Sequence, residues 1–190
     1  MKIGLFFGSF NPIHIGHQII AQTVLNETAL DYVWLIVSPH NPLKEKRNLI
    51  GEYDRLKMAE LAFEGNDRIL ASNVEFTLPR PSYTIDTLTH LADKYRSYEF
   101  SLIMGQDNLL YLDRWKKYEV ILKYYPLYVY PRSGQGATPF DTHPAVHTFE
   151  APLLDISATR IRQLVQEQKS IRYLVSEPVR TYIEQSALFK

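Results

Sequence analysis

Short apolar runs alternate along this chain with segments whose apolar residues recur at helical spacing. The first run, Ile3 to Phe7, is apolar throughout, as in a strand buried on both faces of a parallel sheet. Further strands are expected over residues 32–37, 69–76, 100–104, 127–130 and 146–149. Helices are expected over residues 17–28, 53–63, 83–95 and 109–123. This order predicts right-handed crossovers and an α/β, Rossmann-like, doubly wound parallel sheet.

The last forty residues change character, because 157–166 and 179–186 both have helical patterns with no strand between them. A length of 190 residues suits one domain of this class. We therefore expect a single domain, with a Rossmann-like core over 1–150 and a small C-terminal helical extension over 151–190.

The composition of the chain indicates which kinds of molecule it binds. Lys plus Arg and Asp plus Glu both number 21, so the chain lacks the basic excess typical of proteins that bind duplex nucleic acid. It has no cysteine, which excludes disulfides, thiolate catalysis and cysteine-based zinc sites. No apolar stretch reaches the length of a membrane span, and the N-terminus lacks a signal-peptide pattern. These features predict a cytoplasmic protein that acts on small molecules, without a nucleic-acid or membrane partner.

The loop after the first strand, Gly8 to His17, has the most informative sequence, GSFNPIHIGH. Its two glycines allow close backbone approach to a ligand, and it leads into a helix whose first N–H groups favour an anion. Two imidazoles, His14 and His17, stand at this helix start and can donate hydrogen bonds to phosphate oxygens. The helix dipole opposes their protonation, so we treat them as neutral donors.

Other phosphate loops and metal sites fit this segment less well. The Gly-Lys-Ser/Thr end of a Walker loop is missing, and so is the GxGxxG pattern of a dinucleotide fingerprint. A metal site would need a third ligand near the two histidines, and none is close in sequence. We therefore expect no metal bound by the protein alone.

The whole loop resembles the GxFxPxHxGH signature of the nucleotidyltransferase superfamily. A second segment, Ile156 to Arg162 (ISATRIR), is similar to that superfamily's ISSTxxR motif. From the residues alone, Ser157 or Thr159 suits a helix cap and Arg160 or Arg162 a phosphate clamp; a capped surface helix with solvated arginines is the alternative. The resemblance implies ATP binding by Gly8, Ser9, Phe10, His14, Gly16, His17, Ile156, Ser157, Thr159 and Arg160, with the C-terminal part completing the ATP site.

Two more segments are similar to the bacterial nicotinate-nucleotide adenylyltransferases. Ser82 to Leu88 (SYTIDTL) looks like that family's SYTxxTL, and Met104 to Asp107 (MGQD) with Trp115 looks like its GxD…W pattern. An indole stacks well on a flat pyridinium ring. The resemblance covers nearly the full length and implies that Gly105 and Asp107 contact ATP. It also implies that the mononucleotide is bound by His40, Lys44, Tyr83, Thr84, Asp107, Trp115 and Arg132.

Three positions depart from the family pattern. The loop after the second strand reads HNPLK rather than the commoner PHK, which leaves the roles of His40 and Lys44 open. Phe7 stands where the family often has Gly, and Ala158 replaces the second Ser of ISST. Simpler interpretations also remain, with Ser82 or Asp107 as a helix cap and Trp115 as a core residue.

The resemblance implies that AMP passes from ATP to nicotinate mononucleotide, which gives nicotinate adenine dinucleotide and pyrophosphate. The attacking phosphate is already an anion and needs no general base, so catalysis reduces to positioning and charge stabilisation by His14, His17 and Arg160. Mg²⁺ is expected to be carried mainly by the ATP phosphates. The alternatives are nicotinamide mononucleotide or phosphopantetheine as acceptor, or a non-catalytic nucleotide sensor. A homo-oligomer is one option that the sequence leaves open.

Overall fold

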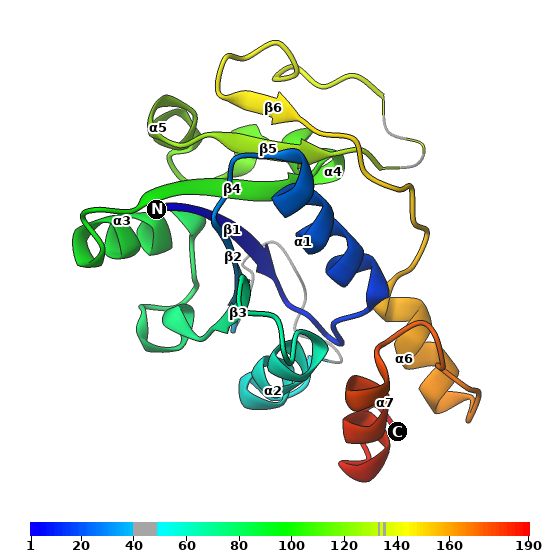
Figure 1. The fold of residues 1–190 in the computed structure, drawn as a ribbon. Helices are drawn as coiled ribbons and strands as arrows, with labels where there is room; N and C mark the ends of the chain where they lie inside the picture. Colours follow the sequence, from blue (N-terminus) through cyan, green and yellow to red (C-terminus); the bar gives the residue numbers. More distant parts are fainter. Residues whose placement is uncertain (40–48, 133, 135) are drawn as a thin grey trace.

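The computed structural model describes residues 1–39, 49–132, 134 and 136–190. Within them, one parallel sheet has the order β3-β2-β1-β4-β5-β6 (Figure 1). The strands are β1 (Lys2–Gly8), β2 (Tyr32–Val37), β3 (Ile69–Ser72), β4 (Glu99–Gly105), β5 (Leu127–Tyr130) and β6 (Val146–Thr148). The predicted doubly wound fold is confirmed. The order reverses between β1 and β4, and the carboxyl ends of these two strands therefore border the crevice where ligands bind in such sheets.

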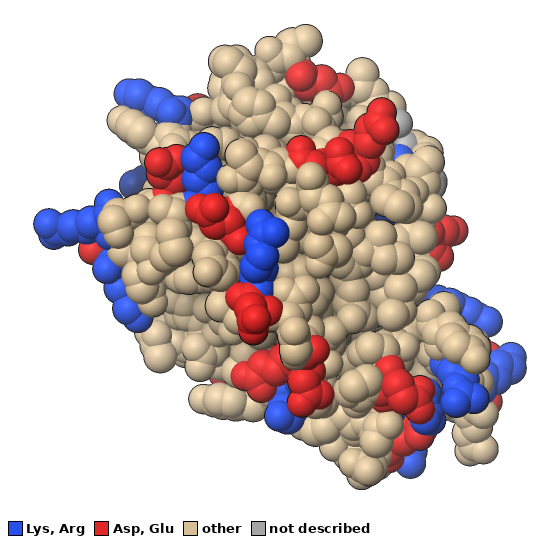
Figure 2. Space-filling view, viewed as in Figure 1, with Lys and Arg blue, Asp and Glu red and all other residues tan. Residues whose placement is uncertain are grey.

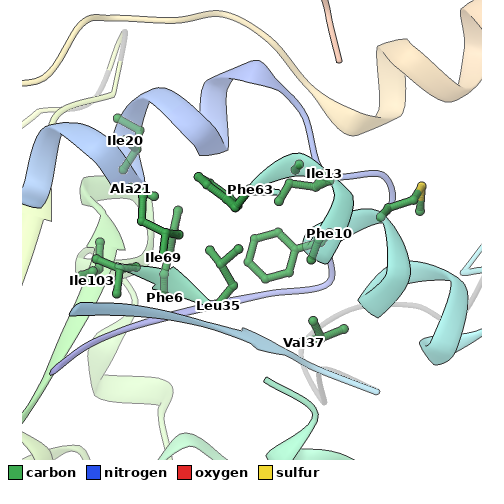
Figure 3. Close-up of a cluster of buried hydrophobic side chains, with 14 of the residues drawn as sticks. Phe6, Phe10, Ile13, Ile20, Ala21, Leu35, Val37, Phe63, Ile69 and Ile103 are labelled. Carbon is green, nitrogen blue, oxygen red and sulfur yellow. The ribbon is translucent and has the colours of Figure 1, made fainter. Parts of the chain in front are cut away.

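Helices cover both faces of the sheet. The main ones before the C-terminal part are α1 (Ile15–Glu27), α2 (Glu52–Ala62), α3 (Thr84–Lys94) and α5 (Tyr118–Tyr124). Side chains alternate between two buried clusters, as the pleat of a strand requires. Phe6 and Leu35 pack with residues of α1 and α2, whereas Leu5 and Leu102 pack with those of α3 and α5. Figure 3 shows part of the first cluster between α1 and the sheet.

The C-terminal helices α6 (Ala158–Gln166) and α7 (Glu177–Gln185) lie beside each other at one side of the sheet (Figure 1). Ile161, Val179 and Ile183 are almost fully buried and belong to the same cluster as α1 and α2. Burial of each such side chain contributes roughly 1.5–3 kcal/mol. The Tyr182 hydroxyl also donates to Asp54 Oδ1 at 2.8 Å. The extension is therefore joined to the main core through α2.

Two sequence expectations need correction. The extended segment expected over 69–76 ends at Ser72, and a 3₁₀ turn follows over Val74–Thr77. The single helical region expected over 109–123 is three short pieces, α4 (Gln106–Leu109), a 3₁₀ turn and α5. Trp115 is extended and Lys117 is left-handed at φ 54°, which interrupts the helix. Helical spacing of apolar residues survives such breaks, because Leu112 and Ile121 are buried on either side.

None of the helices in the described part of the chain is long and apolar enough to cross a membrane. On the face shown in Figure 2, acidic and basic side chains are intermixed, and several of them form a row across the face to the left of its centre. This distribution agrees with the zero formal net charge of the sequence.

Candidate active site

A pocket lies at the carboxyl edge of the sheet, beside the start of α1. Residues from β1, the loop before α1, the end of β5 and the segment before α6 share its wall. The lining residues are Phe6, His14, Gly16, His17, Ile20, Tyr130, Pro131, Arg132, Pro152, Leu154 and Ile156. Five residues singled out from the sequence thus border one space, although they come from three distant segments: His14, Gly16, His17, Arg132 and Ile156.

The two histidines are held against each other at the amino end of α1. Their ring centroids are 3.8 Å apart, and His14 is the N-cap residue of the helix. The backbone N–H of His14 donates to Nδ1 of His17 at 3.2 Å. Because Nδ1 accepts, the proton of a neutral His17 belongs on Nε2, which makes Nε2 a donor. Nδ1 of His14 is buried and has no hydrogen-bond partner among the described residues.

The environment keeps His14 neutral. Burial, and to a smaller extent the positive charge of Arg132, together lower its pKa from the ordinary 6.5 to about 4. This agrees with the neutral donor expected from the helix dipole. The carbonyl of Leu174 accepts the N–H of Ile15 at 3.0 Å, so the C-terminal extension contacts the same helix start.

Phe10, which the resemblance implies as an ATP contact, has its side chain in the core. Its side chain is 2% exposed and lies in the core (Figure 3), edge-on to Phe6 and 5.1 Å from the His17 ring. A Cβ on Gly8 would stand 2.7 Å from the Phe10 ring, so any other residue there would push this ring aside. Only the backbone of Phe10 is therefore placed to contact a nucleotide. The Phe10 ring packs against the His17 ring.

The ends of β4 and β5 supply a charged pair. Asp107 Oδ1 lies 3.6 Å from Arg132 Nε, and a Cβ on Gly105 would come within 2.3 Å of that same oxygen. The absence of a side chain at Gly105 therefore allows the pair to form. Tyr130, at the end of β5, was not singled out from the sequence; its pKa is raised by burial beside the pair. Its position at a strand's carboxyl end is the signal that could have found it.

The two arginines of the ISATRIR segment have different environments. Arg160, which the resemblance implied as a phosphate ligand, is exposed and lies 3.7 Å from Glu167 in an ion pair. Arg162 instead donates to the carbonyl of Asn11 at 2.8 Å and to Thr159 Oγ1 at 3.3 Å. Ser157, not Thr159, caps α6 by accepting the Arg160 N–H. Of these two arginines, Arg162 is therefore the one that contacts the loop Gly8 to His17, which we call the histidine loop.

The SYTIDTL segment lies at the amino end of α3. Tyr83 is the N-cap residue, in place of the Ser82 cap considered from sequence, and Thr84 is the first helical residue. Tyr83 and Trp115 are both partly buried against the cluster on the α3 and α5 face. Lys116 joins the two segments, since its Nζ lies 4.6 Å from the Tyr83 ring and 2.8 Å from Asp86. Sequence reasoning missed Lys116.

The structure gives no side-chain position or no side-chain contact for three of the predicted site residues. His40 and Lys44 lie outside the described residues. For Ser9, the visible contact is made by its backbone carbonyl, which accepts from Arg55. Across the described ranges, no group of three histidine, aspartate or glutamate side chains is arranged to hold a metal ion.

Comparisons with known proteins identify the family. Residues 5–164 match the model of the family described as cytidylyltransferase-like. A probable nicotinate-nucleotide adenylyltransferase of Cytophaga hutchinsonii is 53% identical, with 96% of this chain and 95% of that protein covered. The chain belongs to this adenylyltransferase family. A second relative of the same description, from Flavobacterium psychrophilum, is 48% identical over the full length of both chains.

Solved structures agree on the fold. The nicotinic acid mononucleotide adenylyltransferase of Plasmodium falciparum, complexed with NaAD, superposes with a TM-score of 0.83 over 99% of this chain and 97% of its own. Its sequence is only 17% identical. Similar architecture at such low identity shows that the α/β framework, including the C-terminal helices, is common to both proteins.

Proposed function

We propose that this chain transfers AMP from ATP to the 5′-phosphate of nicotinate mononucleotide. An oxygen of that phosphate forms a bond to the α-phosphorus of ATP, the bond from the α-phosphorus to the bridging oxygen breaks, and pyrophosphate leaves. The observation that carries the proposal is the pair of adjacent imidazoles, His14 and His17, at the amino end of α1, beside the switch point of the sheet. The substrate assignment is supported by the full-length similarity to nicotinate-nucleotide adenylyltransferases.

On the ATP side, hydrogen-bond donors converge on one pocket. Nε2 of His17 and the ring of His14 supply neutral donors, and Arg132 supplies a positive charge. Donors of this kind act on charge that develops as the bond to pyrophosphate lengthens. Arg160 would have to leave Glu167 to reach a phosphate. ATP enters as its magnesium complex, so Mg²⁺ is treated as part of the substrate, and Asp107 is the nearby carboxylate suited to it or to a ribose.

On the acceptor side, we assign the pyridine ring to Trp115 and Tyr83 and its carboxylate to the first turn of α3. Thr84 begins that helix, where N–H groups and a hydroxyl favour an anion. Lys116 adds a positive charge beside Tyr83. A carboxylate gains more from these groups than a neutral amide does, which favours nicotinate over nicotinamide mononucleotide.

The test is a panel of acceptors with ATP and Mg²⁺ held fixed. Pyrophosphate release and dinucleotide mass are measured with nicotinate mononucleotide, nicotinamide mononucleotide and phosphopantetheine. We expect nicotinate mononucleotide to give the highest kcat/KM. ATP binding without pyrophosphate release from any acceptor would instead support the sensor alternative. The cytoplasmic location and the oligomeric state stay predictions.

A further inference from the structure

Among the described residues, Arg55 is the largest fully buried side chain, although it lies on α2 and outside the pocket. It is 1% exposed, and its hydrogen bonds end on main-chain carbonyls from separate segments. Nη1 donates to Ser9 and to Ser38, both at 2.7 Å, and Nη2 to Pro39 at 3.2 Å. Nε donates to Ile50 at 3.2 Å. One guanidinium therefore connects the loop after β1 with the end of β2.

Burial of this guanidinium has a cost in folding free energy. Burial lowers the pKa of Arg55 to about 10, with Glu52 raising it and Arg80 lowering it, so the side chain stays charged at neutral pH. A buried cation loses its hydration and regains only carbonyl dipoles here. A hydrophobic residue at this position would fill the core without that cost. The specific gain from arginine is a rigid fork that fixes several carbonyls at once.

The connection continues from Ser38 to the acceptor side. The Glu75 carboxyl is 1% exposed, and Oε1 accepts from the Thr87 hydroxyl at 2.7 Å. The Ser38 and Ser82 hydroxyls act, like that of Thr87, to lower the pKa of the Glu75 carboxyl, but burial outweighs them and the pKa is raised. Oε2 of Glu75 and Oγ of Ser82 have no hydrogen-bond partner among the described residues. Thr87 is on the first turns of α3. Glu75 thus joins the end of β2 to the helix that begins with the SYTIDTL segment.

We propose that Arg55 and Glu75 are positioning residues that hold the two substrate-binding halves at the spacing needed for phosphate to attack the α-phosphorus. The chain of contacts runs from Ser9, through Arg55, Ser38 and Glu75, to Thr87. Neither charged side chain is among the residues that line the pocket. The inference rests on the proposed function, because it assigns ATP to the β1 loop and the mononucleotide to α3.

The kinetics of Arg55→Lys test the proposal. Lysine keeps the charge but cannot span carbonyls of three segments with a fixed fork. Each half then still binds its own substrate, while the reacting atoms lose alignment. We expect kcat to fall by about 100-fold, as a displacement near 1 Å can cause. The KM values for ATP and for nicotinate mononucleotide should each change by less than threefold.

A second variant and a control separate positioning from stability. Thr87→Val removes the hydroxyl that donates to Glu75. It should lower kcat as Arg55→Lys does, but by a smaller factor. Met58→Ala, on the same helix as Arg55 and fully buried in the core, should lower the melting temperature and leave kcat and both KM values within twofold. All rates are compared at a temperature where circular dichroism shows each variant to be folded.

The possible outcomes are distinct. If wild-type protein releases no pyrophosphate with nicotinate mononucleotide, the proposed function fails. If wild type is active and both folded variants keep kcat within twofold, the positioning role is overturned. A loss that appears only in KM, or equally in Met58→Ala, also contradicts it, since a general loosening of the core would then explain the result.

Discussion

The two halves of the crevice are built differently. On the ATP side, His14 and Tyr130 are less than a tenth exposed, and the His17 ring packs on the buried ring of Phe10. On the acceptor side, the contact that joins α3 to the Trp115 segment is made by Lys116 and Asp86, whose side chains are 41% and 48% exposed. The two histidines for the triphosphate are thus held by the core, whereas the Lys116–Asp86 contact of the pyridine subsite is solvated, as is the Arg132–Asp107 pair on the ATP side. We therefore expect mutations on the ATP side to lower kcat strongly, and mutations on the acceptor side to change mainly the KM for the acceptor.

The largest effect is expected for His17→Ala. Loss of one preorganised donor to developing charge lowers kcat by about 10²–10³-fold. Pyrophosphate release measures this, with His147→Ala as the control, because His147 is an exposed residue on β6. Near-normal turnover by folded His17→Ala would remove the distinction between a rigid catalytic half and an adjustable one.

A smaller and more selective effect is expected for Trp115→Ala. Stacking of a base on an aromatic side chain is worth about 1–3 kcal/mol. The KM for nicotinate mononucleotide should therefore rise by roughly tenfold, while the KM for ATP stays within twofold. Trp34→Phe, in a different aromatic cluster on the same face of the sheet, is the matched control. An equal rise in both KM values would place Trp115 in the core rather than in the acceptor subsite.

Protonation of His14 gives a prediction for stability. Its pKa in the folded protein is about 4, below the ordinary value of 6.5, so the unfolded chain binds the proton more readily between these values. The unfolding free energy should therefore fall as the pH drops from 6.5 toward 4. Urea titrations of wild type and His14→Asn at several pH values measure this. Between pH 6.5 and 4, the unfolding free energy of wild type should fall more than that of His14→Asn. If the two free energies change in parallel with pH, His14 is not desolvated.

The smallest effect is expected for Lys116→Met. Exposed ion pairs contribute about 0–1 kcal/mol, and the contact of Lys116 with the Tyr83 ring is of similar size. The KM for nicotinate mononucleotide should rise by no more than about fivefold at low salt, and by less at high salt. Nicotinamide mononucleotide, which lacks the carboxylate, should be little affected. A large, salt-independent loss would show that the acceptor side is as tightly organised as the ATP side.

The sequence by itself determined the order of the strands, most of the helices and the position of the loop Gly8 to His17, but not the end of the strand that begins at Ile69. Ile3 to Phe7 and Tyr32 to Val37 are apolar runs whose period and turns are local properties, readable without knowing any partner. The helix expected from residue 17 begins at Ile15, with His14 as its N-cap residue. Where local spacing was ambiguous, as around Trp115, the expected helix was wrong, because helical periodicity does not reveal breaks between helical pieces.

Only the tertiary structure decided which side chains face the crevice. Arg162 rather than Arg160 donates to the carbonyl of Asn11, at a separation of 151 residues, and the Phe10 side chain packs in the core. Arg55 reads as a polar position on an amphipathic helix, yet packing buries it among carbonyls of distant loops. These outcomes depend on how separate elements stack, which sets burial and hydrogen-bond partners that no short stretch of sequence contains.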